Sequence, residues 1–67
     1  MKKYFIGGFW FAGTPAQKPF VVGGWDKARL MSEGSAPAYY DTREEAEASA
    51  KNLMWWYKGL KFNVQEA

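Results

Sequence analysis

The sequence predicts an α+β protein in which an antiparallel β-sheet of three to four strands carries one α-helix packed on one face, in the order βββαβ. The first half of the chain is rich in aromatic and β-branched residues between Gly- and Pro-containing turns, as in strands and hairpins. One stretch of the second half has the capping pattern and apolar spacing of an amphipathic helix. A chain of 67 residues fits a single domain, 1–67.

The strands are predicted from the positions of apolar residues between turns. The first covers residues 3–11, with a weak point or bulge at Gly7-Gly8. The same pattern of apolar residues around a glycine pair returns over residues 20–31, which predicts the second strand. A tight turn at 32–35 then leads into a short third strand at 38–40.

The helix is predicted from its two ends and from its buried side. Thr42 and Glu45 fit a capping box, in which the threonine hydroxyl accepts from the backbone of Glu45 and the glutamate reaches back. Gly59 is suited to the position after the last turn. The expected buried stripe consists of Ala46, Ala50, Leu53 and Tyr57, with Met54 at its border.

The last strand is predicted over residues 60–65, because apolar and polar side chains alternate there. Such alternation indicates a strand with one buried face. The sequence leaves open whether this strand lies beside the first or the third.

The register of the first hairpin decides which side chains share a face. A hairpin centred on Pro15-Ala16 pairs Phe11 with Phe20 and Gly7 with Gly24. We expect the helix to cover the phenylalanine-rich face, because phenylalanine has no polar atom to satisfy. On this register that face holds Phe5, Phe9, Phe11, Phe20 and Val22, and the opposite face holds Tyr4, Ile6, Trp10, Val21 and Trp25.

The face that the helix leaves open is the predicted partner-binding surface. Tryptophan, tyrosine and arginine are enriched at interface hot spots, and an exposed apolar patch usually marks an interaction site. Adjacent helical residues point about 100° apart, so at least one of Trp55 and Trp56 should be exposed and extend this surface. The candidate partner-binding residues are Tyr4, Trp10, Trp25, Lys27, Arg29, Trp55 and Trp56.

The composition argues against catalysis and against bound cofactors. The chain has no cysteine and no histidine, which removes disulfides, zinc fingers and the usual nucleophile and base. Most acidic residues belong to the helix start, a turn or the tail, which leaves Asp26 as an isolated candidate. We therefore expect no enzyme activity, no cofactor and no metal site. The net charge of +2 is small for a nucleic-acid-binding domain.

Two segments resemble parts of known families. Residues 3–9, Lys-Tyr-Phe-Ile-Gly-Gly-Phe, look like the first-strand motif of RNA recognition motifs. The pattern Tyr39-x-x-Thr42-x-x-Glu45-Ala46-x-x-x-Ala50, with an aromatic helix end and an alternating last strand, is similar to part of the bacteriophage inhibitors of bacterial RNA polymerase. The arginines of that family's last strand are replaced here by Lys61, Asn63 and Gln65. The resemblance implies a small phage accessory protein that blocks a host machine of transcription or antiviral defence.

The expected function is that of a small non-enzymatic binding protein that docks an aromatic sheet face on a host protein. Two alternatives stay open: a single-stranded nucleic-acid binding module, which stacks bases on the aromatic face, and a homodimer that buries this face for stability. No apolar run approaches the ~20 residues that span a bilayer, so we expect a cytoplasmic protein with no membrane partner, located in the bacterial host if phage-encoded.

Overall fold

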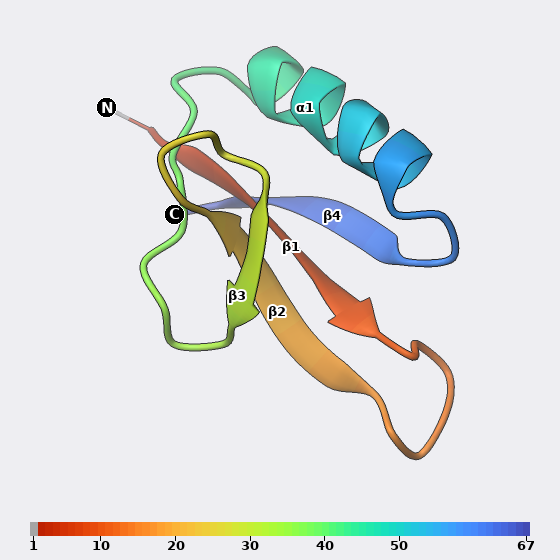
Figure 1. The fold of residues 1–67 in the computed structure, drawn as a ribbon. Helices are drawn as coiled ribbons and strands as arrows, with labels where there is room; N and C mark the ends of the chain where they lie inside the picture. The colour runs from red at the N-terminus through yellow and green to blue at the C-terminus, as the bar shows by residue number, and fades with distance from the viewer. Residues whose placement is uncertain (1) are drawn as a thin grey trace.

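The computed structural model describes residues 2–67 and has a four-stranded antiparallel sheet with one helix on one of its faces (Figure 1). The spatial order of the strands is β3-β2-β1-β4, and the sheet is open. This confirms the predicted α+β fold and the order βββαβ. The elements are β1 (Tyr4–Trp10), β2 (Lys18–Gly23), β3 (Arg29–Ser32), α1 (Arg43–Trp56) and β4 (Lys61–Glu66).

The second predicted strand, 20–31, is divided by a turn into β2 and β3. Gly24 and Lys27 both have positive φ angles, 88° and 56°, and the Lys27 N–H donates to the Gly24 carbonyl over 3.1 Å. This backbone conformation reverses the chain and is incompatible with a continuous strand. The pattern of residues 20–31 therefore describes a hairpin made of β2 and β3. β3 ends at Ser32, where the predicted turn begins.

The predicted strand 38–40 is wrong. Tyr40 forms a single antiparallel bridge with Tyr4, and the Ala38 N–H donates to the Val22 carbonyl over 3.0 Å. The segment thus bonds to β1 on one side and to β2 on the other. It fills the space where these two strands diverge beyond the pair Gly7↔Val21 and satisfies backbone groups left there.

The predicted register of the first hairpin is also wrong, by three residues. Gly7 pairs with Val21 rather than with Gly24, and the last pair is Trp10↔Lys18. The cause lies in the loop: Phe11 leaves the strand with a φ of 54°, and its carbonyl accepts both the N–H and the hydroxyl of Thr14 over 3.2 and 2.7 Å. The chain therefore turns earlier than a hairpin centred on residues 15 and 16.

An odd shift in register exchanges the two faces of a strand relative to its neighbour. For β1 the predicted faces are exchanged: Ile6 is fully buried under the helix, and Phe5 and Phe9 point to the open face. For β2 the prediction holds, since Phe20 and Val22 face the helix. The buried core consists of Ile6, Phe20, Val22, Tyr40, Ala46, Ala50 and Leu53.

The helix begins as the sequence predicts. Thr42 is the N-cap, and its hydroxyl accepts from the Glu45 N–H over 3.2 Å. Ala46, Ala50 and Leu53 form the buried stripe. Tyr57 lies beyond it as the C-cap residue, and its side chain is 38% exposed.

β4 follows the helix and pairs with β1, not with β3, which settles the alternative that the sequence left open. Its alternation is confirmed, because Phe62 and Val64 pack toward the core and the residues between them are exposed. β1 is therefore a central strand and β4 an edge strand that lies under α1 (Figure 1). Among residues 2–67 no helix has the length and hydropathy to cross a membrane.

Candidate binding surfaces

Two of the predicted binding residues, Tyr4 and Trp10, lie on the helix-covered face and pack against the core. The Trp10 ring lies 5.0 Å from that of Phe20, and the Arg43 guanidinium lies 5.1 Å above the ring of Tyr4. Both side chains are only partly exposed. The prediction that they lie on the open face is wrong, and the reason is the shift in register described above.

The other predicted residues of the sheet lie in or next to the β2–β3 turn. Trp25, at the tip of this turn, is 90% exposed, the highest value of any large apolar side chain in the described chain. Lys27 and Arg29 are exposed beside it. Trp25 therefore makes little contribution to the core, and its indole is available to a partner.

Trp55 and Trp56 are both exposed, to 68% and 76%. They occupy the last turn of α1, past the buried stripe that ends at Leu53. The Lys58 ammonium lies 4.9 Å above the ring of Trp55. Such a cation–π contact holds the indole in place without covering it fully.

The turn that carries Trp25 and the end of α1 lie on the same side of the sheet. The Tyr57 hydroxyl, just past the helix, donates to the Ala28 carbonyl, just past the turn, over 3.4 Å. Lys27 of the turn lies 4.6 Å above the ring of Tyr40, which belongs to the core. We refer to Trp25, Trp55 and Trp56 as the exposed tryptophans.

The face of the sheet that the helix leaves uncovered carries a second apolar area. Phe5 and Phe9 point out from β1, and Phe5 meets Tyr39 edge to face with ring centroids 6.3 Å apart. Lys61 lies opposite Phe9 on β4 and places a cation at its margin. Sequence reasoning missed this area because it assigned the phenylalanines to the helix; we call Phe5, Phe9, Val21, Met31 and Tyr39 the open face.

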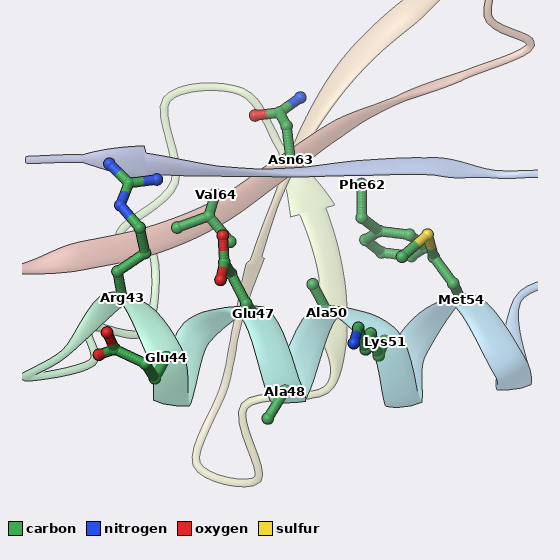
Figure 2. A pocket seen from close by; sticks show the side chains of 10 residues that line it. All are labelled: Arg43, Glu44, Glu47, Ala48, Ala50, Lys51, Met54, Phe62, Asn63 and Val64. Atoms are coloured by element: carbon green, nitrogen blue, oxygen red, sulfur yellow. The ribbon is translucent and has the colours of Figure 1, made fainter.

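A groove of about 570 Å³ lies between the outer side of α1 and the free edge of β4 (Figure 2). Figure 2 shows Val64 and Phe62 of β4 directed toward the helix, with Glu47 and Met54 below them. The sequence offered a signal for this groove, because Glu44, Glu47, Ala48 and Lys51 recur at the spacing of one helical stripe outside the apolar one.

Residues 2–67 hold no group of three or more acids close enough to share a metal. The pKa of Asp41 lies below its usual value of 3.8, first because the Lys3 ammonium donates a 2.9 Å hydrogen bond to it and then because of the ammonium's charge. This pair joins the start of β1 to the start of α1, which is a structural role.

Comparisons with protein-family models, with curated proteins and with solved structures give no significant match.

Proposed function

We propose that this protein is a small non-enzymatic binding protein that docks its exposed tryptophans on a protein partner. The single observation that carries the proposal is the exposure of Trp25, Trp55 and Trp56, at 90%, 68% and 76%. Tryptophan buries more apolar area than most side chains when a partner covers it and is the residue type most enriched at hot spots. Three such side chains exposed on one side of a small sheet favour an interface.

The charges around these tryptophans favour a partner with an acidic surface. Lys27 follows Trp25 by two residues and is exposed, and Lys58 lies over Trp55. Arg29 adds a third exposed cation close to the turn. Complementary charges at the rim of an interface steer association and fix its register. The resemblance to phage inhibitors suggests a host macromolecular machine, of transcription or antiviral defence, as the class of partner.

The first experiment compares what the wild type and a Trp25→Ala/Trp55→Ala/Trp56→Ala variant capture from a bacterial lysate, followed by affinity measurement on the purified partner. We expect each tryptophan to account for about 2 kcal/mol, or roughly 30-fold in Kd, if it is a hot spot. Lys18→Glu is a charge-changing control away from these residues, since Lys18 is exposed on β2. Capture that is equal for the wild type and the triple variant would contradict the proposal.

A stability measurement separates the two groups of predicted residues. Trp25→Ala should leave the urea midpoint almost unchanged, because the side chain is 90% exposed. Trp10→Ala should lower the free energy of unfolding by about 2 to 3 kcal/mol, because it removes the ring that packs on Phe20. If Trp25→Ala unfolds the protein, the residue is structural and no longer supports a binding role.

A second candidate function, binding of single-stranded nucleic acid, is favoured by the open face. Phe5 and Phe9 are four residues apart on a central strand, so both present their rings on one face, and Lys61 lies beside Phe9. Bases stack on such rings, and binding weakens steeply with salt. Titration of the wild type and of Phe9→Ala with a single-stranded oligonucleotide at two salt concentrations tests this function. Saturable, salt-sensitive binding that Phe9→Ala weakens would favour it over the docking of the tryptophans.

A further inference from the structure

β4 has a free edge with unpaired backbone groups. Tyr4 uses both its N–H and its C=O to bond Tyr40, over 3.0 and 2.8 Å, so Tyr4 does not bond to Glu66, its neighbour on β4. Glu66 therefore directs its own N–H and C=O away from β1, and in an antiparallel strand every second residue does the same. Within β4 the backbone groups that face away from β1 belong to Phe62, Val64 and Glu66.

The groove beside this edge has the charges of a self-complementary surface. Glu44 and Glu47 lie toward one end of its helical wall together with Arg43, so that end has two carboxylates and one guanidinium, and Lys51 lies toward the other (Figure 2). Among residues 2–67 these four side chains are in no ion pair. Ala48 lies between them and leaves room for a close approach. An antiparallel copy of the same wall would set the acidic end of one helix against the basic end of the other.

We propose that a second copy of this chain occupies the groove, with the β4 strands of the two copies paired antiparallel about a two-fold axis at Val64. The two sheets then become one sheet of eight strands, with both helices on the same face. A contact of this kind is isologous. If one residue of the first copy contacts another residue of the second copy, the same pair also forms with the two copies exchanged.

The sequence of β4 is compatible with this register. Val64 lies opposite Val64 of the second copy, and Asn63 lies opposite Gln65, which sets two amides side by side on the open face. Phe62 lies opposite Glu66, and Lys61 opposite Ala67. No two like charges face each other across the seam.

The helices select this register among its neighbours. In Figure 2 Val64 lies above Glu47, so an axis at Val64 crosses α1 near that level. Glu44 then lies across from Lys51 of the second copy, and the reverse pair forms by symmetry. An axis at Asn63, which Figure 2 shows near the level of Ala50, would set Lys51 opposite Ser49 and Glu44 opposite Trp56 of the second copy, so the pairs between Glu44 and Lys51 would not form.

The spacing of the helices also fits. α1 packs on both β4 and β1, so its axis lies about one strand spacing, ~4.8 Å, from the seam. The two helix axes would then lie about 10 Å apart, at the upper end of the distance at which helices pack. Trp25 and Trp56 lie outside this wall, whereas Trp55 continues its stripe one turn past Lys51. The proposal is argued from the β4 edge and the groove, and it does not depend on the function proposed above.

The test is the solution mass by light scattering after size exclusion, over about a hundredfold range of protein concentration. We expect a dimer that Lys51→Glu weakens at least ~10-fold in Kd, because it sets carboxylates against carboxylates across the seam. Glu44→Lys/Glu47→Lys should weaken it in the same way. An equimolar mixture of the two variants should restore a heterodimer, which a loss of folding would not do.

Lys18→Glu is the matched control, since it makes the same change in charge on β2, away from the seam. Hydrogen exchange supplies a second readout: the amides of Phe62, Val64 and Glu66 should exchange more slowly as the concentration rises. The amides of Lys61, Asn63 and Gln65 point to β1 and should not change.

A wild type that stays monomeric over the whole range overturns the proposal. So does a dimer that Lys51→Glu leaves intact, or one that only the triple tryptophan variant dissociates, because the contact then lies at the exposed tryptophans. If Lys51→Glu loses its far-UV circular dichroism signal, the variant is unfolded. The mixture of the two variants and the concentration dependence of hydrogen exchange in the wild type then decide the proposal.

Discussion

Gly8 is the residue at which the sheet leaves least room for a side chain. A Cβ added there would overlap the Lys61 carbonyl and lie 2.6 Å from Cζ of Phe20. The absence of a side chain thus lets the Phe20 ring cross β1 and reach Phe62, 5.4 Å away between ring centroids. The glycine pairs are visible in the sequence, but this role is not, because it depends on the register Gly8↔Phe20, whereas the predicted register pairs Phe20 with Phe11.

We expect Gly8→Ala to lower the free energy of unfolding by ~3 kcal/mol or more, because backbone and ring must both move. Gly7→Ala is the control: its Cβ would meet mainly Nε2 of Gln65, at 2.8 Å, and that amide can rotate away. Its cost should stay near ~1 kcal/mol. Urea denaturation of both variants measures the difference. Equal urea midpoints for Gly8→Ala and Gly7→Ala would show that the lack of space at Gly8 does not set the cost of a side chain there.

The exposed tryptophans are a residue-scale feature of a different kind. Their exposure follows from local position, since Trp25 is at a turn and Trp55 and Trp56 are in the last helical turn. Trp10 is of the same residue type but lies at the end of β1 on the helix-covered face, where the Phe20 ring packs against it. Residue type alone could therefore not separate binding residues from core residues in this chain.

At the scale of elements, α1 is held at its start by two polar contacts. The Thr42 hydroxyl caps the helix, and Asp41 receives a hydrogen bond from Lys3. Four N–H groups at a helix start have no partner within the helix, and a cap satisfies one of them. The start of α1 is thereby tied to the residue before β1.

Thr42→Ala should destabilise the protein by about 1 kcal/mol through the loss of this cap, and Thr42→Ser should restore most of the difference. The thermal midpoint and the urea midpoint of the three proteins provide the measurement. A Thr42→Ser variant as unstable as Thr42→Ala would mean that the methyl group, not the hydroxyl, carries the effect.

The contact between Lys3 and Asp41 predicts a dependence on pH. The pKa of Asp41 is lowered in the folded state by the hydrogen bond from Lys3 and then by its charge. A carboxyl with a lowered pKa stabilises the fold fully above its unfolded pKa of 3.8, and this contribution is lost as the pH falls through the folded pKa.

Asp41→Asn should therefore be less stable than the wild type at neutral pH and should approach it in acid, below the folded pKa of Asp41. The effect should be small and should shrink with added salt, because the side chain is 78% exposed. Urea midpoints at neutral and acid pH, each at two salt concentrations, measure it. If the difference in urea midpoint between Asp41→Asn and the wild type were the same at both pH values, the contact between Lys3 and Asp41 would have no part in the pH dependence of stability.

At the scale of the whole molecule, the strand order sets where the structure is most stable. β1 pairs with β4 over Tyr4–Phe9 and with β2 over Gly7–Trp10, whereas β3 is a four-residue strand at the edge. We expect the backbone amides of β1 to exchange most slowly with solvent and those of β3 to exchange much faster. Hydrogen exchange followed by NMR measures both. Equal protection of β1 and β3 would indicate that the sheet opens only as one unit.

The sequence by itself determined the features of this protein that depend on neighbours along the chain. The cap at Thr42, the buried stripe Ala46-Ala50-Leu53 and the alternation of β4 follow from spacings of a few residues, and each is present in the structure. Together with the strand-like first half they predict the α+β class, which the structure has. The order βββαβ also matches, although the third strand is Arg29–Ser32 and not the predicted 38–40. The exposure of Trp55 or Trp56 followed in the same way from the 100° step of a helix.

Only the tertiary structure decided which side of each strand meets the helix and which strand β4 joins. The first depends on the turn at residues 11–14, where the Thr14 hydroxyl and the positive φ angles of Phe11 and Gly13 set a register three residues from the predicted one and exchanged the faces of β1. Because side chains alternate with a period of two, any odd shift reverses them all, and apolar residues on both faces could not exclude it. The open face and the edge of β4 are consequences of contacts between distant residues, which local spacing does not specify.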